Sequence, residues 1–138
     1  MTQRFTKIGA AGQPLPADAA EWAAVLDEQS GLMWTAGEDK PMVWKKTGAY
    51  ATKLQIAGFT DWRVPTRAEL ILLVDDTKFL PAIDTTYFPN SKSDRYWSST
   101  PAASSPGGCA WYVDFDDGYS DYDDQSGEGL VRAVRARQ

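Results

Sequence analysis

Apolar and polar residues alternate between positions 109 and 116, where the sequence reads CAWYVDFD. In an extended strand, successive side chains point to opposite faces of the sheet. The pattern therefore predicts a strand over residues 110–115 whose core side carries Trp111, Val113 and Phe115. Its solvent side would carry Tyr112 and Asp114, with Asp116 following.

The other apolar segments predict more strands and two helices. Strands are expected at residues 5–8, 22–27, 32–34, 95–99 and 130–136. Ser30-Gly31 predicts a hairpin turn between the second and third of these. One helix is expected over residues 47–57, ended by Gly58. A second should begin after Thr66, which forms a capping-box pattern with Glu69. Its apolar face would consist of Leu70, Leu73 and Val74.

Residues 75–93 predict a long irregular segment that its own apolar side chains pack down. These side chains are Leu80, Ile83, Tyr87 and Phe88. Strands at both ends of the chain with helices between them are typical of an α+β fold with an antiparallel sheet. A chain of 138 residues has the length of one domain, which we take to span residues 1–138.

The acidic charge is concentrated in one segment. The formal net charge is −5, and seven of the 19 acidic residues lie between positions 114 and 128, where there is no Lys or Arg. Such a segment repels phosphates, so we expect no nucleic-acid partner. A basic or neutral ligand suits it better.

Several classes of chemistry lack the residues they need. Cys109 is the single cysteine and there is no histidine, so an intrachain disulfide is impossible and zinc or haem has no ligands of the usual kind. No apolar run has the length of a membrane span, and the N-terminus lacks a hydrophobic signal core. We expect no cofactor, no metal and no membrane insertion. The chain as written would be cytoplasmic, or at the cell surface if it is a fragment of a larger exported chain.

Four tryptophans and four charged residues are predicted to be structural. The expected core tryptophans are Trp34, Trp62, Trp97 and Trp111. The expected structural ion pairs involve Asp61, Arg63, Arg132 and Arg135.

Beyond Gly118, the chain is almost entirely Tyr, Ser, Asp and Gly, which we interpret as a loop over residues 116–128. Rigid tyrosines among small hydrogen-bonding residues are typical of antibody paratopes. Two other interpretations remain open, a solvated acidic loop and a calcium site without an EF-hand pattern.

Five segments together resemble the C-terminal domain family of the Legionella collagen-like protein. They are SGLMW (30–34), AGFTDWRVPTRAEL (57–70), YWSST (96–100), AWYVDFDDG (110–118) and VRAVR (131–135). The resemblance implies a C-type-lectin-like fold, related to formylglycine-generating enzymes. In this fold the N- and C-terminal strands pair, two helices pack against a central sheet, and long loops lie at one end.

The same resemblance implies a function in binding. The family occurs in bacterial surface and adhesion proteins, and it supplies variable proteins of diversity-generating retroelements, in which a C-terminal segment is rewritten by adenine-directed mutagenesis. The ligand-binding positions would then be Tyr112, Asp114, Asp116, Asp117, Tyr119, Ser120, Asp121, Tyr122, Asp123 and Asp124. Formylglycine-generating enzymes need reactive cysteines, which Cys109 alone does not supply, so we expect no enzymatic activity.

We therefore expect a ligand-binding display domain that recognises a protein or other macromolecular partner through a Tyr/Asp/Ser-rich surface. The alternative is a surface adhesion module that binds polysaccharide, with or without the help of calcium. A third possibility is a structural domain within a larger assembly.

Overall fold

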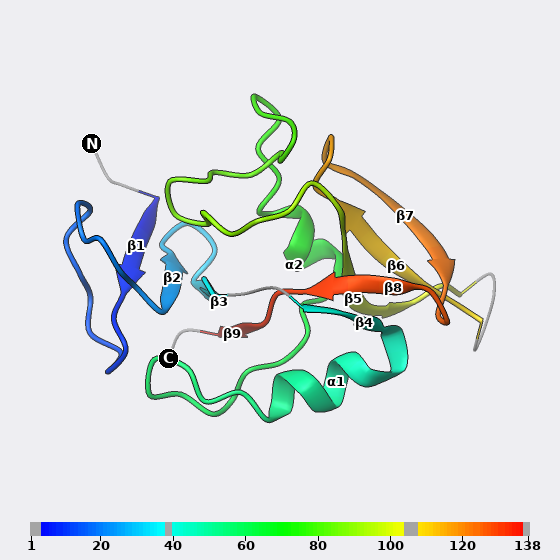
Figure 1. Ribbon diagram of the computed structural model, residues 1–138, viewed down its shortest axis with the longest axis horizontal. Helices are drawn as coiled ribbons and strands as arrows, with labels where there is room; N and C mark the ends of the chain where they lie inside the picture. The colour runs from blue at the N-terminus through cyan, green and yellow to red at the C-terminus, as the bar shows by residue number, and fades with distance from the viewer. Residues whose placement is uncertain (1–3, 38–39, 104–107, 137–138) are drawn as a thin grey trace.

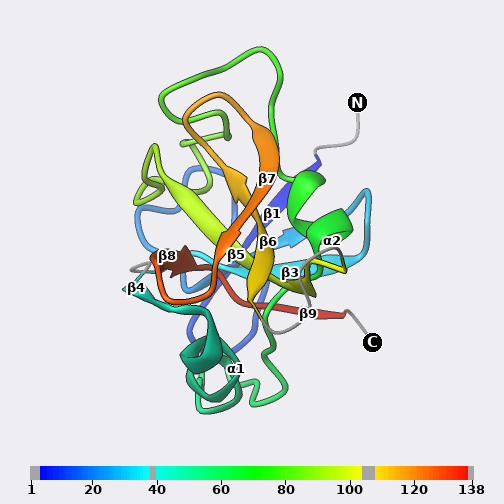
Figure 2. The same cartoon turned by 90° about the vertical axis from the view of Figure 1, so that its right-hand side faces the viewer.

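The computed structural model describes residues 4–37, 40–103 and 108–136, and these form two β-sheets and two short helices (Figures 1 and 2). The α+β class predicted from the sequence is confirmed. The C-type-lectin-like fold itself stays a prediction. No helix among the described residues is long and apolar enough to cross a membrane.

The first sheet brings the two ends of the chain together. Its strand order is β1-β2-β3-β9, and all its pairs are antiparallel. The strands are β1 (Phe5–Ile8), β2 (Ala24–Asp27), β3 (Leu32–Thr35) and β9 (Val134–Ala136). The predicted β2–β3 hairpin is confirmed, and Gly31 adopts a positive φ of 78° in its turn. The C-terminal strand pairs with β3 and not with β1, so the two terminal strands share a sheet without being neighbours.

The second sheet contains the segment expected to bind ligands. Its order is β4-β8-β5-β6-β7. The strands are β4 (Lys40–Val43), β8 (Glu128–Val131), β5 (Arg95–Pro101), β6 (Cys109–Asp114) and β7 (Tyr119–Asp124). The prediction of an antiparallel sheet is wrong at one point, because β5 and β8 run parallel where Tyr96 pairs with Leu130.

The first helix, α1, spans Trp44–Thr52, so it begins and ends earlier than the predicted 47–57. It cannot continue through residue 57, because Ala57 has a φ of 57°, outside the helical region. Gly58 therefore does not cap the helix. It has a φ of 78° and lies in a tight turn where Ile56 pairs with Phe59.

The second helix, α2, spans Arg67–Ile71 and begins as predicted. Thr66 accepts a hydrogen bond from the Glu69 amide at 3.2 Å, and the Glu69 carboxylate accepts one from the Thr66 amide at 2.9 Å. Leu70 and Leu73 are buried on the predicted apolar face, and Val74 is partly buried.

Residues 75–93 form the irregular segment that was expected. Within it, Ile83 and Phe88 are buried and hold the segment down. Leu80 is 60% exposed, so the predicted packing role of Leu80 is wrong. The Leu80 amide donates to the Asp116 carbonyl at 2.8 Å, and the Ala82 amide donates to the Phe115 carbonyl at 2.7 Å. These bonds fasten the segment to the turn between β6 and β7.

The main core lies between the two sheets and α2, and includes Trp34, Tyr96 and Phe115. Trp62 and Trp97 are also fully buried, as predicted.

Two of the four residues expected in ion pairs, Asp61 and Arg135, pair with each other at 2.6 Å, while Arg63 pairs with Glu69 at 2.7 Å. Arg132 donates to the Thr35 carbonyl at 3.1 Å and lies over the Phe88 ring at 4.6 Å.

Candidate functional site on the β6–β7 hairpin

The segment interpreted as a loop is largely a strand. β7 pairs along its whole length with β6, from Cys109 opposite Asp124 to Asp114 opposite Tyr119. Phe115 to Gly118 form the connecting turn, in which Gly118 has a φ of 90°. The prediction of a loop over residues 116–128 is therefore wrong. Aspartate is disfavoured in strands, so the aspartates of β7 led to the prediction of a loop where the backbone is extended.

Strand alternation divides the ten predicted site residues between two faces and the turn. One face, which we call the Tyr112 face, carries Tyr112, Asp114, Tyr119, Asp121 and Asp123. The opposite face, which we call the α2 face, carries Ser120, Tyr122 and Asp124 beside Trp111. Asp116 and Asp117 lie in the turn. The ten residues do not form a single surface.

Tyr112 is buried, so its predicted place at the surface is wrong. It is 7% exposed and packs edge-on against Trp97, with 6.3 Å between ring centroids. Burial and a hydrogen bond with Tyr119 raise the pKa of the Tyr112 phenol to about 12. Tyr112 therefore anchors the hairpin to β5, and its neighbour Tyr119, which is 47% exposed, presents the aromatic surface.

The carboxylates of the Tyr112 face have different environments. Asp123 forms an ion pair with Arg95, and hydrogen bonds from the Asp124 amide and from Arg95 lower the pKa of its carboxyl group. Asp121 is exposed, and its carboxylate accepts a hydrogen bond from the Tyr122 amide at 2.8 Å. Asp121 therefore keeps a carboxylate oxygen directed to solvent beside Tyr119.

The α2 face is built around Trp111. This indole was expected in the core, but it is only partly buried. The Arg67 guanidinium lies 3.7 Å from its ring centroid, and the Tyr122 ring meets it edge-on at 4.9 Å. Arg67 also donates to the Ser120 hydroxyl at 2.9 Å, and that hydroxyl donates to the Tyr112 carbonyl at 2.8 Å. Ser120 is thus a structural residue, whereas Tyr122 is 42% exposed.

β7 is the edge strand of its sheet. Two bonds at the ends of the hairpin show which way its backbone groups point. The Phe115 amide donates to the Asp94 carbonyl on the β5 side, and the Gln125 amide donates to the Gly108 carbonyl on the β6 side. By alternation, the amides of the even-numbered residues of β7 point away from β6. Two of them are satisfied locally: the Tyr122 amide by Asp121 at 2.8 Å and the Asp124 amide by Asp123 at 2.7 Å. The edge is partly closed to another strand.

Two residues of this site were missed in the sequence. Arg95 lies two positions before Trp97, so the predicted strand 95–99 placed both on one face. The sequence does not reveal which strand lies next to β6. Arg95 reaches Asp123 because β5, which carries Arg95, lies next to β6 in the sheet. Arg67 follows the helix cap Thr66, and no sequence signal connects it to Trp111.

The carboxylates do not converge on one point. Among the described residues, no group of three or more Asp, Glu, Cys or His side chains is placed to hold a metal ion. The six aspartates of this segment, Asp114, Asp116, Asp117, Asp121, Asp123 and Asp124, are distributed over two faces and a turn. The absence of a metal stays a prediction.

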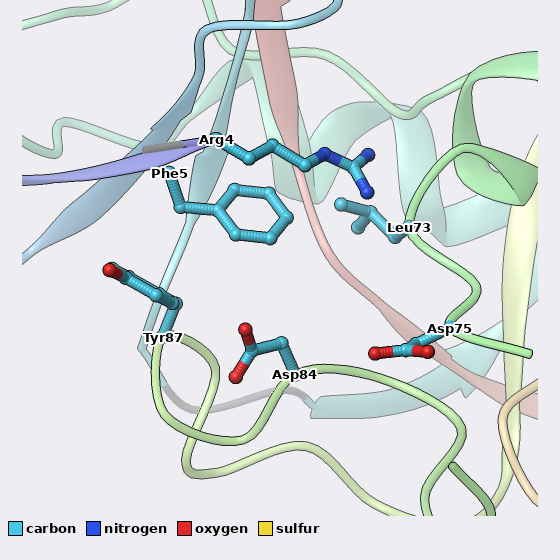
Figure 3. Close-up of a pocket in the computed structure, with 6 residues that line it drawn as sticks. All are labelled: Arg4, Phe5, Leu73, Asp75, Asp84 and Tyr87. Atoms are coloured by element: carbon cyan, nitrogen blue, oxygen red, sulfur yellow. The ribbon is translucent and has the colours of Figure 1, made fainter. Parts of the chain in front are cut away.

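A separate cavity of about 300 Å³ lies between β1 and the 75–93 segment (Figure 3). The carboxylates of Asp75 and Asp84 face it from one side, and the rings of Phe5 and Tyr87 form its opposite wall. Arg4 also lines it, but its charge is engaged by Asp27 at 3.0 Å. None of the residues that line this cavity belongs to the hairpin.

Comparison with known proteins supports the resemblance seen in the sequence. The family model described as the Lcl C-terminal domain matches residues 23–135, which include the whole β6–β7 hairpin. None of the curated proteins matches the chain.

Proposed function

The chain belongs to the Lcl C-terminal domain family, and we propose that it is a ligand-binding display domain whose β6–β7 hairpin recognises a protein or other macromolecular partner. One observation carries this proposal. Tyr119 and Tyr122 are 47% and 42% exposed, on a hairpin whose Val113 and Phe115 are buried in the main core. Large amphipathic side chains held on a rigid frame are what a recognition surface requires.

The chemistry of the hairpin favours a neutral or basic partner. Tyrosine rings offer contact area at a low cost in conformational entropy. The exposed carboxylates Asp116, Asp117 and Asp121 accept hydrogen bonds from ammonium, guanidinium or amide groups. Binding would therefore weaken as salt concentration rises, because exposed charge pairs are screened.

We further propose that the hairpin is the diversified segment of a retroelement variable protein. Tyr119, Asp121 and Tyr122 are exposed, and none of them belongs to a buried core cluster, although Tyr119 shares a hydrogen bond with Tyr112 and Tyr122 packs on the partly buried Trp111. Tyr112, Ser120 and Asp123 are less free, because they contact Trp97, Arg67 and Arg95 respectively. The proposed variable set is therefore smaller than the ten positions predicted from the sequence.

A pair of displayed libraries tests the display function. The first randomises Tyr119, Asp121 and Tyr122, and the control randomises the buried Tyr96, Val113 and Phe115. We expect most members of the first library to keep the parental melting temperature, because exposed substitutions usually change stability by about 0.5 kcal/mol or less. Selection on a panel of basic and neutral proteins should then yield different binders from different sequences. A first library that melts as readily as the control would contradict the proposal.

Two further measurements separate the finer claims. Sequencing beside the gene should find a reverse transcriptase and an imperfect repeat of the hairpin codons that differs at adenines. A uniform hairpin sequence across sister isolates would remove the retroelement claim and leave the binding claim intact. Binding to a polysaccharide that a chelator abolishes would instead support the calcium-assisted adhesion module.

A further inference from the structure

We propose that a groove beside α1, which neither Tyr119 nor Tyr122 of the hairpin lines, binds a single-chain amphiphile with a carboxylate head, of the fatty-acid class. The groove has a volume of about 560 Å³, within the range of small-molecule pockets. Trp44, Gly48 and Thr52 line it from α1, and Val64 lines it from the opposite wall. Its lining is mostly apolar.

Gly48 is the first observation that points to an occupant. It is the fifth residue of α1, where glycine weakens a helix relative to alanine. A Cβ atom added at Gly48 would meet no atom within 4 Å, so crowding does not explain the glycine. Trp44 and Thr52 lie one helical turn before and after it, on the same face. A bare stretch of helix between them lets an extended chain approach the backbone closely.

The walls of the groove are fixed before any ligand arrives. The Trp44 indole donates to the Ser98 carbonyl at 2.8 Å, which holds its ring in place. Val64 is 7% exposed, and the neighbouring Pro65 carbonyl accepts a hydrogen bond from the Ser99 amide at 2.7 Å. A preformed apolar groove loses little entropy on binding.

The charges around the groove select an anionic head. α1 contains Lys45 and Lys46 and no acidic residue. Lys45 lines the groove and forms no ion pair among the described residues, even with Asp124, which borders a neighbouring cavity with it. Arg63 is also at the groove, but Glu69 engages it at 2.7 Å. Among the described residues that line the groove, Lys45 is thus a cation without an ion-pair partner, and it can meet a carboxylate there.

The apolar lining favours an acyl chain over an acidic peptide. A peptide brings backbone amides and carbonyls that need hydrogen-bond partners when they are buried. The side of the groove formed by α1 offers few, because most backbone groups of a helix are bonded within it. An acyl chain needs no such partners, and its carboxylate has Lys45.

Isothermal titration calorimetry with dodecanoate, below its critical micelle concentration, tests the proposal. We expect saturable binding of one molecule per chain. Octanoate should bind at least about tenfold more weakly, because each buried methylene contributes to affinity. Dodecanol, which lacks the charge, should bind about fivefold more weakly than dodecanoate. A tetraglutamate peptide, which lacks the acyl chain, should not bind.

Matched variants on the same helix locate the site. Lys45→Gln should weaken dodecanoate about fivefold, whereas Lys46→Gln, one residue away and not lining the groove, should leave it within about twofold. Gly48→Leu should abolish binding by filling the groove, whereas Ala49→Leu should not. Thermal melting of each variant confirms that it folds.

Phe79→Ser removes the most exposed apolar side chain outside the groove and should not change binding. Binding that is lost in Phe79→Ser, or that is unchanged in both Lys45→Gln and Gly48→Leu, would overturn the proposal. Binding of tetraglutamate that depends on Lys45 would assign the groove to acidic peptides and overturn it as well. None of these outcomes bears on the hairpin.

Discussion

At the scale of single residues, Tyr112 and Trp111 show how position in a sheet decides burial. Tyr112 lies opposite Trp97 in the middle of the sheet, where Trp97, Ala110 and Trp44 enclose it. Trp111 faces the same side as Val113, but Arg67 and Tyr122 cover its ring only in part, so it is half-buried. Alternation correctly separates the two faces of β6 but does not say how much covers each residue.

Truncating these two neighbours should therefore have unequal effects on stability. Tyr112→Ala should lower the free energy of unfolding by about 3–5 kcal/mol, because it leaves a cavity beside Trp97. Trp111→Ala should cost about 1–3 kcal/mol, because its site is open to solvent on one side. Urea denaturation of both variants measures the difference. A larger loss for Trp111→Ala would show that the half-buried indole carries more of the fold than its exposure indicates.

The Tyr112 phenol also predicts a dependence of stability on alkaline pH. Its pKa is raised from 10.0 to about 12 in the folded protein, so the unfolded chain loses this proton first. The stabilising contribution is complete below pH 10 and is lost as pH rises toward 12. The free energy of unfolding should therefore fall more steeply over this window in the wild type than in Tyr112→Phe. Parallel curves for the two proteins would assign the alkaline loss to other groups.

At the scale of secondary-structure elements, β7 contains three aspartates, which have low strand propensity, and its place in the sheet comes from its pairing with β6. Its own side chains satisfy part of its free edge. Asp121 and Asp123 accept hydrogen bonds from the outward-pointing amides of Tyr122 and Asp124. Charged side chains on an edge strand are a common protection against edge-to-edge association.

The edge of β7 gives a prediction in which charge is held constant. Asp121→Ala with Asp123→Ala frees the two amides, whereas Asp121→Asn with Asp123→Asn keeps an oxygen acceptor at both positions. Both pairs remove the same charge and the same ion pair with Arg95. We expect the alanine pair to self-associate at concentrations where the asparagine pair stays monomeric, as measured by light scattering. Equal association of both pairs would show that charge alone protects the edge.

Signals between residues close in sequence predicted one turn and one helix start correctly. Features that depend on contacts between distant residues could not be predicted from the sequence. The β2–β3 turn and the Thr66–Glu69 capping box depend on residues close in sequence, and both are confirmed. The end of α1 was wrong because Ala57 takes a conformation that no short motif marks. Exposure of Tyr119 and Tyr122 followed from their polar context, but the burial of Tyr112 required Trp97, 15 positions away.

At the scale of the whole molecule, the negative charge of residues 114–128 is spread over a surface and does not form a pocket. Aspartates on opposite faces of β7 cannot share one cation, because the strand itself separates them. Under the proposed function, the negative potential of this region would attract basic partners from a distance.

This distribution predicts that calcium does not stabilise the fold. Adding millimolar calcium, or removing it with a chelator, should change the melting temperature by no more than roughly 1 °C, since a ligand raises it only by binding the native state. Calorimetry in matched ionic strength, with magnesium as the control cation, separates specific binding from screening. A calcium-specific rise of several degrees would establish a metal site among these aspartates.

The shared terminal sheet has a consequence for how this domain can be mounted. In Figure 1, β1 lies at the left end of the molecule and β9 lies left of its centre, whereas the β6–β7 hairpin lies on the right. A linker joined to either terminal strand would leave the hairpin facing outward, clear of whatever the linker attaches to. Several copies on one stalk could then engage a multivalent target at once. Modest affinity at each hairpin would suffice, because tethering raises the effective concentration of every further contact.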